Sequence, residues 1–352
     1  MTNQTRHNGG SACATGSADP VFARSLVVRG RVQGVGFRPF VQRLATASRV
    51  AGVVKNLSGQ VLIHAEGTAD ALEVFEAAVL HEAPGLSRPQ LASARDAVVF
   101  GYSGFTIAPS EVSSGAEIHI PPDQSICPDC LAELHDAEDR RFRYPFINCT
   151  ACGPRYTIIE SLPYDRSATS MSAFAMCPSC RAEYENPADR RFHAEPVACA
   201  ECGPTVTFRR VHDEAGDNLD GELALAAAIS ALREGGIVAV RGIGGYHLMC
   251  AADDDGAVAR LRQRKRRPHK PLAVMFPRAG EDGLEVVRRS VVVDEQAARH
   301  LCDPASPIVV LPRKSTCLLS KRLAPGLGDL GVFLPYSPLH YLLLDGFGAP
   351  LV

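Results

Sequence analysis

Four pairs of cysteines with the spacing C-x-x-C are the residues of this chain best suited to chemistry. They belong to two copies of one pattern, which begin at Cys127 and Cys177, and 18 residues separate the two pairs of each copy. Two such pairs brought together offer four thiolates in a tetrahedron, which is the closed coordination of structural zinc. The sequence therefore predicts two structural Zn²⁺ ions with eight ligands. These ligands are Cys127, Cys130, Cys149, Cys152, Cys177, Cys180, Cys199 and Cys202.

Two points about these cysteines stay open in the sequence. Redox-active pairs are the alternative to zinc. Pairing within each copy is the simplest arrangement of the ligands, but the first pair could also join the fourth while the second joins the third. A module of this size is too small to bury a core, so we expect the metal to supply its folding energy.

The two copies also share the sequence D-R-R-F, at residues 139–142 and 189–192. We interpret it as a structural turn with solvated arginines, and a binding surface is the alternative. His193 lies between the pairs of the second copy, where the first copy has Arg143. This asymmetry argues against His193 as a zinc ligand.

A glycine-rich turn at residues 30–36 is the second candidate site, because a strand precedes it and a helix follows from Phe37. Backbone N–H groups converge in such a turn, and a helix N-terminus favours negative charge, so the arrangement can hold an anion. Arg38 lies in the first helical turn, where its guanidinium can bind the same oxyanion. The order βαββαβ predicts a ferredoxin-like fold. We expect a strand at 25–29, a hairpin turn near 56–59, a helix within 68–82 and a last strand near 101–110.

The sequences G-R-V-Q-G-V-G-F-R and V-K-N-L-S-G in this segment resemble those of the acylphosphatase family. The resemblance implies that Arg38 binds the substrate phosphate and that Asn56 orients the attacking water. An acyl phosphate is already activated, so such a site mainly positions water and stabilises charge, and it needs no nucleophilic side chain. The expected phosphate-binding loop consists of Val32, Gln33, Gly34, Val35, Gly36 and Phe37.

Helices, strands and glycine turns alternate over residues 217–352, which predicts an α/β domain. Seven of the eleven residues from Arg260 to Lys270 are lysine or arginine, a pattern typical of a solvated helix end or of a phosphate cradle for a nucleotide. The segment resembles the YrdC/Sua5 family, whose members form carbamoyl-type adenylates from ATP. The resemblance implies that the nucleotide is bound by Lys265, Arg267 and Lys270.

The sequence R-G-I-G-G-Y-H-L at residues 241–248 departs from the usual pattern of that family and indicates a subclass. His247 and His340 could line the pocket of this domain, and a structural role for each is the alternative.

The three parts in this order resemble the HypF carbamoyltransferase family of nickel–iron hydrogenase maturation. The resemblance implies that carbamoyl phosphate is hydrolysed to carbamate and that ATP, with Mg²⁺, converts the carbamate to carbamoyl adenylate. It further implies that the carbamoyl group passes to the C-terminal cysteine of the HypE protein. We therefore expect an α+β multidomain chain with a disordered tail (1–22), an acylphosphatase-like domain (23–110), tandem zinc modules (115–213, with metal frames 127–152 and 177–202) and an incomplete YrdC-like domain (217–352).

Members of this family are longer than 352 residues, so we expect the transfer domain and the last part of the YrdC-like fold to be missing, with adenylate formation impaired. The N-terminal segment has no signal peptide and no apolar run reaches the length of a membrane span, which predicts a cytoplasmic protein without a membrane partner. A general acylphosphatase with zinc modules is one alternative. An RNA-binding protein is another, and the formal net charge of −2 argues against it.

Overall fold

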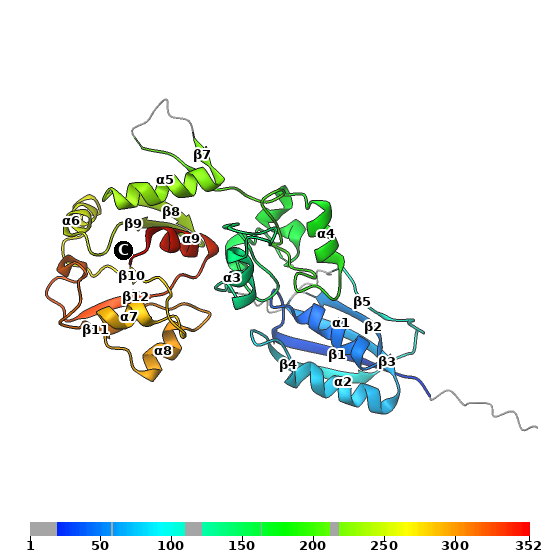
Figure 1. The fold of residues 1–352 in the computed structure, drawn as a ribbon. Coiled ribbons are helices and arrows are strands. Elements are labelled where there is room, and N and C mark those ends of the chain that lie inside the picture. The colour runs from blue at the N-terminus through cyan, green and yellow to red at the C-terminus, as the bar shows by residue number, and fades with distance from the viewer. Residues whose placement is uncertain (1–19, 58, 110–121, 163, 212–217) are drawn as a thin grey trace, which may run out of the picture.

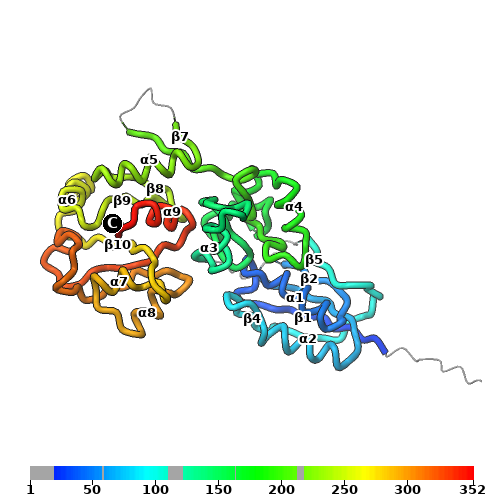
Figure 2. Tube along the Cα trace, in the orientation of Figure 1, coloured from blue at the N-terminus to red at the C-terminus, as the bar shows by residue number. Residues whose placement is uncertain are grey.

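The computed structural model describes residues 20–57, 59–109, 122–162, 164–211 and 218–352. The two cysteine modules lie between an N-terminal sheet domain and a C-terminal α/β part (Figures 1 and 2). Most of the predicted tail, the segment 110–121 and part of the predicted linker near residue 215 lie outside the described residues. No helix in the described ranges is long and apolar enough to cross a membrane.

The N-terminal domain is a five-stranded sheet in the order β4-β1-β3-β2-β5, against which two helices pack. Strand β5 pairs parallel to β2, and the other neighbouring strands are antiparallel. Leu26, Val28, Ile63 and Phe75 are among the residues of its buried core. The elements are β1 (Phe22–Arg31), α1 (Phe37–Ala47), β2 (Ala51–Leu57), β3 (Gln60–Gly67), α2 (Ala69–His81), β4 (Arg88–Asp96) and β5 (Phe105–Ile107).

The sequence predicted every element of this domain except β4. This strand lies at the edge of the sheet, and most of its residues are exposed or half-buried. Because neither of its faces is fully buried, its sequence R-P-Q-L-A-S-A-R-D lacks the apolar alternation that marks a strand. Strand β1 also begins earlier than expected, at Phe22, which places this residue in the sheet rather than in the tail.

The two cysteine modules repeat the same local structure. Each has a short helix, α3 (Pro128–His135) or α4 (Pro178–Glu185), that begins directly after the first cysteine with proline in its first turn. Arg143 and His193 follow the repeated D-R-R-F sequence with nearly identical positive φ values of 53° and 52°. Between the modules run three short 3₁₀ helices, η1 (Tyr156–Ile158), η2 (Arg166–Ala168) and η3 (Ser170–Ala173).

The C-terminal part contains a three-stranded sheet in the order β10-β12-β11 and a β8–β9 hairpin. Helices α5 and α9 pack on the first cysteine module, because Leu225 and Leu343 share one buried core with Ile147. Helix α6 (Asp255–Arg264) contains the first part of the basic stretch. The elements are β6 (Thr207–Phe208), β7 (Leu219–Asp220), α5 (Gly221–Arg233), β8 (Val238–Gly242), β9 (Gly245–Met249), α6, β10 (Val274–Met275), α7 (Glu285–Ser290), α8 (Glu295–Leu301), β11 (Val309–Pro312), η4 (Lys321–Leu323), β12 (Asp329–Phe333) and α9 (Pro338–Phe347).

Candidate active site and metal centres

The eight predicted ligands form two clusters of four sulfur atoms, and each cluster belongs to one copy of the repeat. Neighbouring Sγ atoms lie 3.5–3.8 Å apart in the first cluster and 3.7–3.8 Å apart in the second. Four sulfurs bound to one zinc ion at about 2.3 Å lie roughly 3.8 Å from one another in a tetrahedron. Both clusters therefore fit structural zinc with no open position, and the crossed arrangement is wrong.

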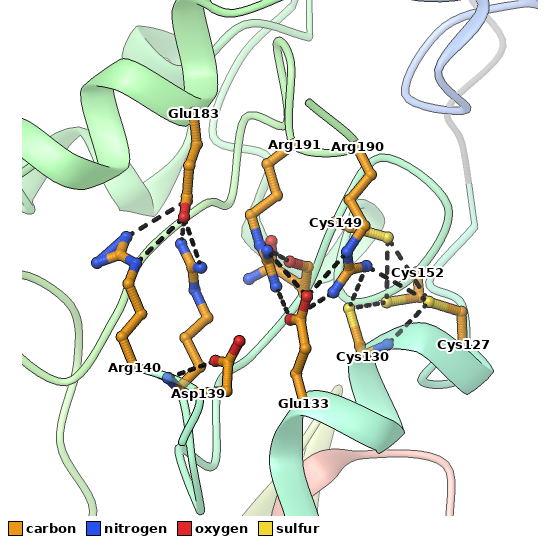
Figure 3. Close-up of polar contacts among 12 residues, drawn as sticks. Cys127, Cys130, Glu133, Asp139, Arg140, Cys149, Cys152, Glu183, Arg190 and Arg191 are labelled. Carbon is orange, nitrogen blue, oxygen red and sulfur yellow. Dashed lines mark hydrogen bonds and ion pairs between the residues drawn. The ribbon is translucent and has the colours of Figure 1, made fainter. Parts of the chain in front are cut away.

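Each module contacts the sulfur cluster of the other module through the repeated arginines. Arg140 of the first module donates a hydrogen bond to Cys180 Sγ at 2.9 Å, and Arg190 of the second donates one to Cys130 Sγ at 3.1 Å. A zinc ion with four thiolates carries net negative charge, so each guanidinium compensates charge at the neighbouring cluster. Figure 3 draws the first of these clusters together with Arg190.

The second arginine of each repeat is buried, which corrects the prediction of solvated side chains. Arg141 is 1% exposed and Arg191 is 4% exposed. Arg141 pairs with Glu183 of the second module, and Arg191 pairs with Glu133 of the first. The two modules are thus held face to face by the same contacts made in both directions. Burial alone would raise the pKa of Glu133, but hydrogen bonds from Arg191 and Arg190 lower it overall.

Arg38 and Asn56, the two residues predicted to be catalytic, contact each other beside the glycine-rich turn. Helix α1 begins directly after Gly36, whose φ of 74° is accessible to glycine at little cost. Arg38 is 8% exposed and Asn56 is fully buried. In the amide orientation that satisfies both side chains, the Asn56 oxygen accepts hydrogen bonds from Arg38 Nε at 3.2 Å and from Nη2 at 3.3 Å.

The predicted loop residues divide into two groups. Val32, Gly34, Gly36 and Phe37 line a small cavity together with Arg38. Gln33 and Val35 do not line it, because Gln33 donates a hydrogen bond to the Gln60 carbonyl and Val35 packs in the domain core.

The opposite wall of this cavity comes from the cysteine modules and the segment between them, which sequence reasoning missed. Arg38 Nη2 lies 3.2 Å from Asp165 Oδ1 and 3.4 Å from Glu195 Oε1. His193 and Tyr164 also line the cavity. Burial and the nearby Arg38 charge lower the pKa of His193 to about 4, so the ring is neutral near pH 7. Burial is the main cause that raises the pKa of Glu195, and the Asp165 charge adds to it.

The repeat itself contained a signal for this wall. The second copy has His193, Ala194 and Glu195 where the first has Arg143, Tyr144 and Pro145. Arg143 instead pairs with Glu222 of α5, at 2.9 Å. At residues 143–145 and 193–195 the two copies therefore differ where each module faces a different domain.

A second, larger cavity of about 630 Å³ lies between the cysteine modules and the C-terminal part. Phe146, Met171 and Phe174 line it from the modules, and Arg241 and Tyr336 line it from the α/β part. This size is ample for a nucleotide-sized ligand.

The structure does not bring Lys265, Arg267 and Lys270 to that cavity. Lys265 and Lys270 are exposed on the turn that follows α6, and Arg267 is half-buried. The turn is organised by Arg262, which is 7% exposed and donates hydrogen bonds to three backbone carbonyls of the turn. One member of the basic stretch is therefore a buried structural residue.

His247 and His340 do not line the larger cavity, but both contact Tyr336, which does. The Tyr336 hydroxyl lies 2.7 Å from His247 Nε2. His340 is completely buried, and neither ring nitrogen has a hydrogen-bond partner among the described residues. Burial lowers the pKa of His340 to about 3, and the neighbouring His247 contributes to this shift.

Three family models match successive parts of the chain. The acylphosphatase family model matches residues 24–107, the HypF finger matches 126–159 and 176–209, and the Sua5/YciO/YrdC family, described as telomere recombination, matches 230–352. An acylphosphatase of Methanospirillum hungatei is 43% identical over 84 residues, which cover 92% of that protein.

Longer relatives match nearly the whole chain. The carbamoyltransferase HypF of Rhodobacter capsulatus is 50% identical over 92% of this chain and 42% of its own length. The HypF of Synechocystis is 45% identical over 93% of this chain and 42% of its own. A crystal structure of full-length HypF in the phosphate- and nucleotide-bound form superposes with a TM-score of 0.87 at 42% identity, covering 96% of this chain and 43% of that one.

The fold and the metal centres define an acylphosphatase domain joined through paired four-cysteine zinc modules to a YrdC-like domain. The chain belongs to the HypF carbamoyltransferase family. It spans about two fifths of the length of the curated HypF relatives it matches.

Proposed function

We propose that this chain hydrolyses carbamoyl phosphate to carbamate and phosphate at Arg38 and Asn56. The observation that supports this most strongly is the buried pair that these side chains form beside the start of α1. The backbone of the loop from Val32 to Phe37 and the Arg38 guanidinium hold the phosphate, and Asn56 orients a water molecule. The water oxygen bonds to phosphorus as the bond between phosphorus and the acyl oxygen breaks, and carbamate leaves with that oxygen.

Stabilisation of charge is the main catalytic contribution in this proposal. The leaving carbamate is a weakly basic anion, so it needs no proton from the protein, and the attacking water releases its proton to solvent. Arg38 offsets the charge that develops on the phosphoryl oxygens within a buried site, where electrostatic interactions are strong.

The second step uses the cavity between the zinc modules and the YrdC-like domain. We propose that carbamate attacks the α-phosphorus of ATP there, with Mg²⁺, to form carbamoyl adenylate and release pyrophosphate. A HypF relative was crystallised with phosphate and a nucleotide, which supports both steps. Lys265, Arg267 and Lys270 do not line this cavity, so in this proposal they bind only phosphate groups that extend out of it toward the turn after α6. Carbamate decomposes readily in water. Transfer between two sites of the same chain, past the zinc modules that lie between them, limits its exposure to bulk solvent.

The final acceptor in this proposal is the C-terminal cysteine thiol of HypE, where the carbamoyl group becomes the precursor of a cyanide ligand. We propose the cytoplasm as the site of the reaction, because eight zinc-binding thiols need a reducing compartment.

Phosphate release from carbamoyl phosphate tests the first step. Loss of the guanidinium in Arg38→Ala should lower kcat by a factor on the order of 10² to 10³. Arg43→Ala, which changes an exposed arginine of the same helix, is the matched control and should hydrolyse at the wild-type rate. Equal rates in wild type and Arg38→Ala would contradict the proposal.

A further inference from the structure

The acyl-phosphate site has a wall that the acylphosphatase domain does not supply. Tyr164, His193, Ala194 and Glu195 line the cavity together with the glycine-rich turn and Arg38. A phosphate group held by the turn and by Arg38 therefore directs its acyl end toward this wall. The residues of the wall are placed to distinguish one acyl group from another.

Glu195 is held so that one carboxylate oxygen faces the site. Its Oε2 accepts hydrogen bonds from the Tyr184 hydroxyl and from the Arg166 backbone N–H, both at 2.9 Å. Its Oε1 contacts Arg38 Nη2 at 3.4 Å, which is long for such a hydrogen bond. The side chain is only 2% exposed, so bulk water does not supply a better donor.

Tyr164 offers the complementary group. The residue is 2% exposed, and its hydroxyl has no hydrogen-bond partner among the described residues. Burial raises the pKa of Tyr164, so the hydroxyl stays protonated and can donate. A buried polar group without a partner is unfavourable, which means that a ligand oxygen able to accept this proton gains affinity.

We propose, on the basis of the acyl-phosphate hydrolysis proposed above, that Glu195 and Tyr164 select acyl phosphates whose acyl group is a carboxamide. Glu195 Oε1 accepts a hydrogen bond from the amino group of carbamoyl phosphate, and the Tyr164 hydroxyl donates to its carbonyl oxygen. Acetyl phosphate has nearly the same size, but its methyl group leaves Glu195 Oε1 with only the long contact to Arg38. A site built to bind an N–H group disfavours the analogue that lacks it.

The position of Glu195 in the repeat agrees with a dedicated role. The first cysteine module has Pro145 at the corresponding place, so the zinc module does not need a carboxylate there for its own fold. The carboxylate occurs only in the copy whose loop faces the acylphosphatase domain.

Binding requires Asp165 to leave Arg38. The cavity has a volume of about 20 Å³, which is room for about one water molecule. The Asp165 side chain is 29% exposed and contacts Arg38 through one hydrogen bond. It can therefore turn toward solvent, whereas Glu195 keeps its two further hydrogen bonds and stays at the wall.

The test is kcat/KM for carbamoyl phosphate and for acetyl phosphate, measured on the whole chain. In Glu195→Gln the amide oxygen keeps the donors from Tyr184 and Arg166, so the amide NH₂ faces the cavity and opposes the substrate NH₂. The preference for carbamoyl over acetyl phosphate should fall about ten- to a hundredfold. Tyr164→Phe should lower both values by about tenfold and leave their ratio unchanged, because both substrates have the carbonyl oxygen.

The controls are Glu201→Gln and Tyr156→Phe, which change exposed residues of the same region and should keep the wild-type ratio. A ratio that stays at the wild-type value in Glu195→Gln, including a parallel loss for both substrates, would overturn the assignment of Glu195. A Tyr164→Phe variant with wild-type kinetics would overturn that of Tyr164.

A wild-type chain that hydrolyses neither compound contradicts the proposed function, and binding then decides this inference. Calorimetric titration with carbamoylphosphonate and acetylphosphonate should show a preference for the former that Glu195→Gln abolishes. Equal affinities in the wild type would overturn the proposal.

Discussion

Arg155 donates a hydrogen bond of 2.6 Å from Nε to the carbonyl oxygen of Gly34, and so joins the first zinc module to the glycine-rich turn. Its other guanidinium nitrogens bind backbone carbonyls around the second cysteine pair of that module, including those of Cys149 and Cys152. Arg155 is 2% exposed. The second cysteine pair of the first module and the glycine-rich turn are therefore positioned by one side chain.

Arg155 also lines the cavity beside Arg38, and replacing its guanidinium should disturb the hydrolytic site through the glycine-rich turn. Arg155→Lys keeps the positive charge but removes the planar guanidinium, whose N–H groups bind backbone carbonyls of two domains. We expect kcat/KM for carbamoyl phosphate to fall about tenfold while two zinc ions per chain are retained. Arg181→Lys, at an exposed position of α4, should retain wild-type kinetics. Wild-type kinetics in Arg155→Lys would show that the turn does not depend on the module.

The reciprocal arginine contacts predict that a change in one module loosens the metal of the other. Arg190→Ala removes a hydrogen bond to Cys130 Sγ and should lower zinc affinity about 10- to 100-fold in the first cluster. Arg140→Ala should do the same to the second cluster. Mass spectrometry of alkylated cysteines, sampled during competition with a chelator, distinguishes the clusters. Faster alkylation within the mutated module, or equal effects in both, would contradict the contacts.

We propose that the Asp165 carboxylate competes with phosphate for the Arg38 guanidinium. Asp165→Asn removes the competing negative charge 3.2 Å from the guanidinium. The inhibition constant of inorganic phosphate in the hydrolysis assay should therefore fall about fivefold. Asp253→Asn, an exposed aspartate of the YrdC-like domain, is the control. Weaker inhibition by phosphate in Asp165→Asn would mean that this carboxylate helps to build the site instead.

Buried His340 should make the chain less stable in mild acid. Its pKa is lowered to about 3 from an unfolded value near 6.5, so the unfolded chain binds more protons between these values. The stability that this group contributes is present above pH 6.5 and is lost as the pH falls from 6.5 toward 3. Between pH 6.5 and 5, before most carboxylates titrate, the predicted loss is on the order of 2 kcal/mol from His340 alone.

A thermal melting series over this pH range checks the prediction. His340→Leu should flatten the pH dependence of Tm, whereas His300→Leu, at an exposed position of α8, should leave it as in the wild type. An unchanged slope in His340→Leu would assign the acid sensitivity to other groups, of which His193 is one.

The grouping of the eight cysteines and the position of Arg38 could be predicted from sequence because they depend on local spacing. The C-x-x-C pairs specified the zinc ligands, and the turn before Phe37 specified the position of Arg38. Strand β4 was missed because an exposed edge strand carries no apolar alternation.

The contacts between the parts could not be predicted, because they join residues far apart in the chain. Arg141 was expected to be solvated, yet it is buried and pairs with Glu183, which lies 42 residues away in the sequence. Arg38 meets Glu195 across 157 residues, and no periodicity in either segment indicates this contact. The second copy differs from the first at residues 193–195, but the copies differ at other positions too, so this difference alone does not locate the contact.

We propose that the acylphosphatase domain and the zinc modules together build one hydrolytic site. Phosphate release from carbamoyl phosphate can be followed while a chelator removes zinc, with released zinc measured in the same sample. We expect hydrolysis to fall in step with zinc loss and to recover when zinc is restored, although the metal binds no substrate. A zinc-free chain that hydrolyses carbamoyl phosphate at the wild-type rate would contradict it.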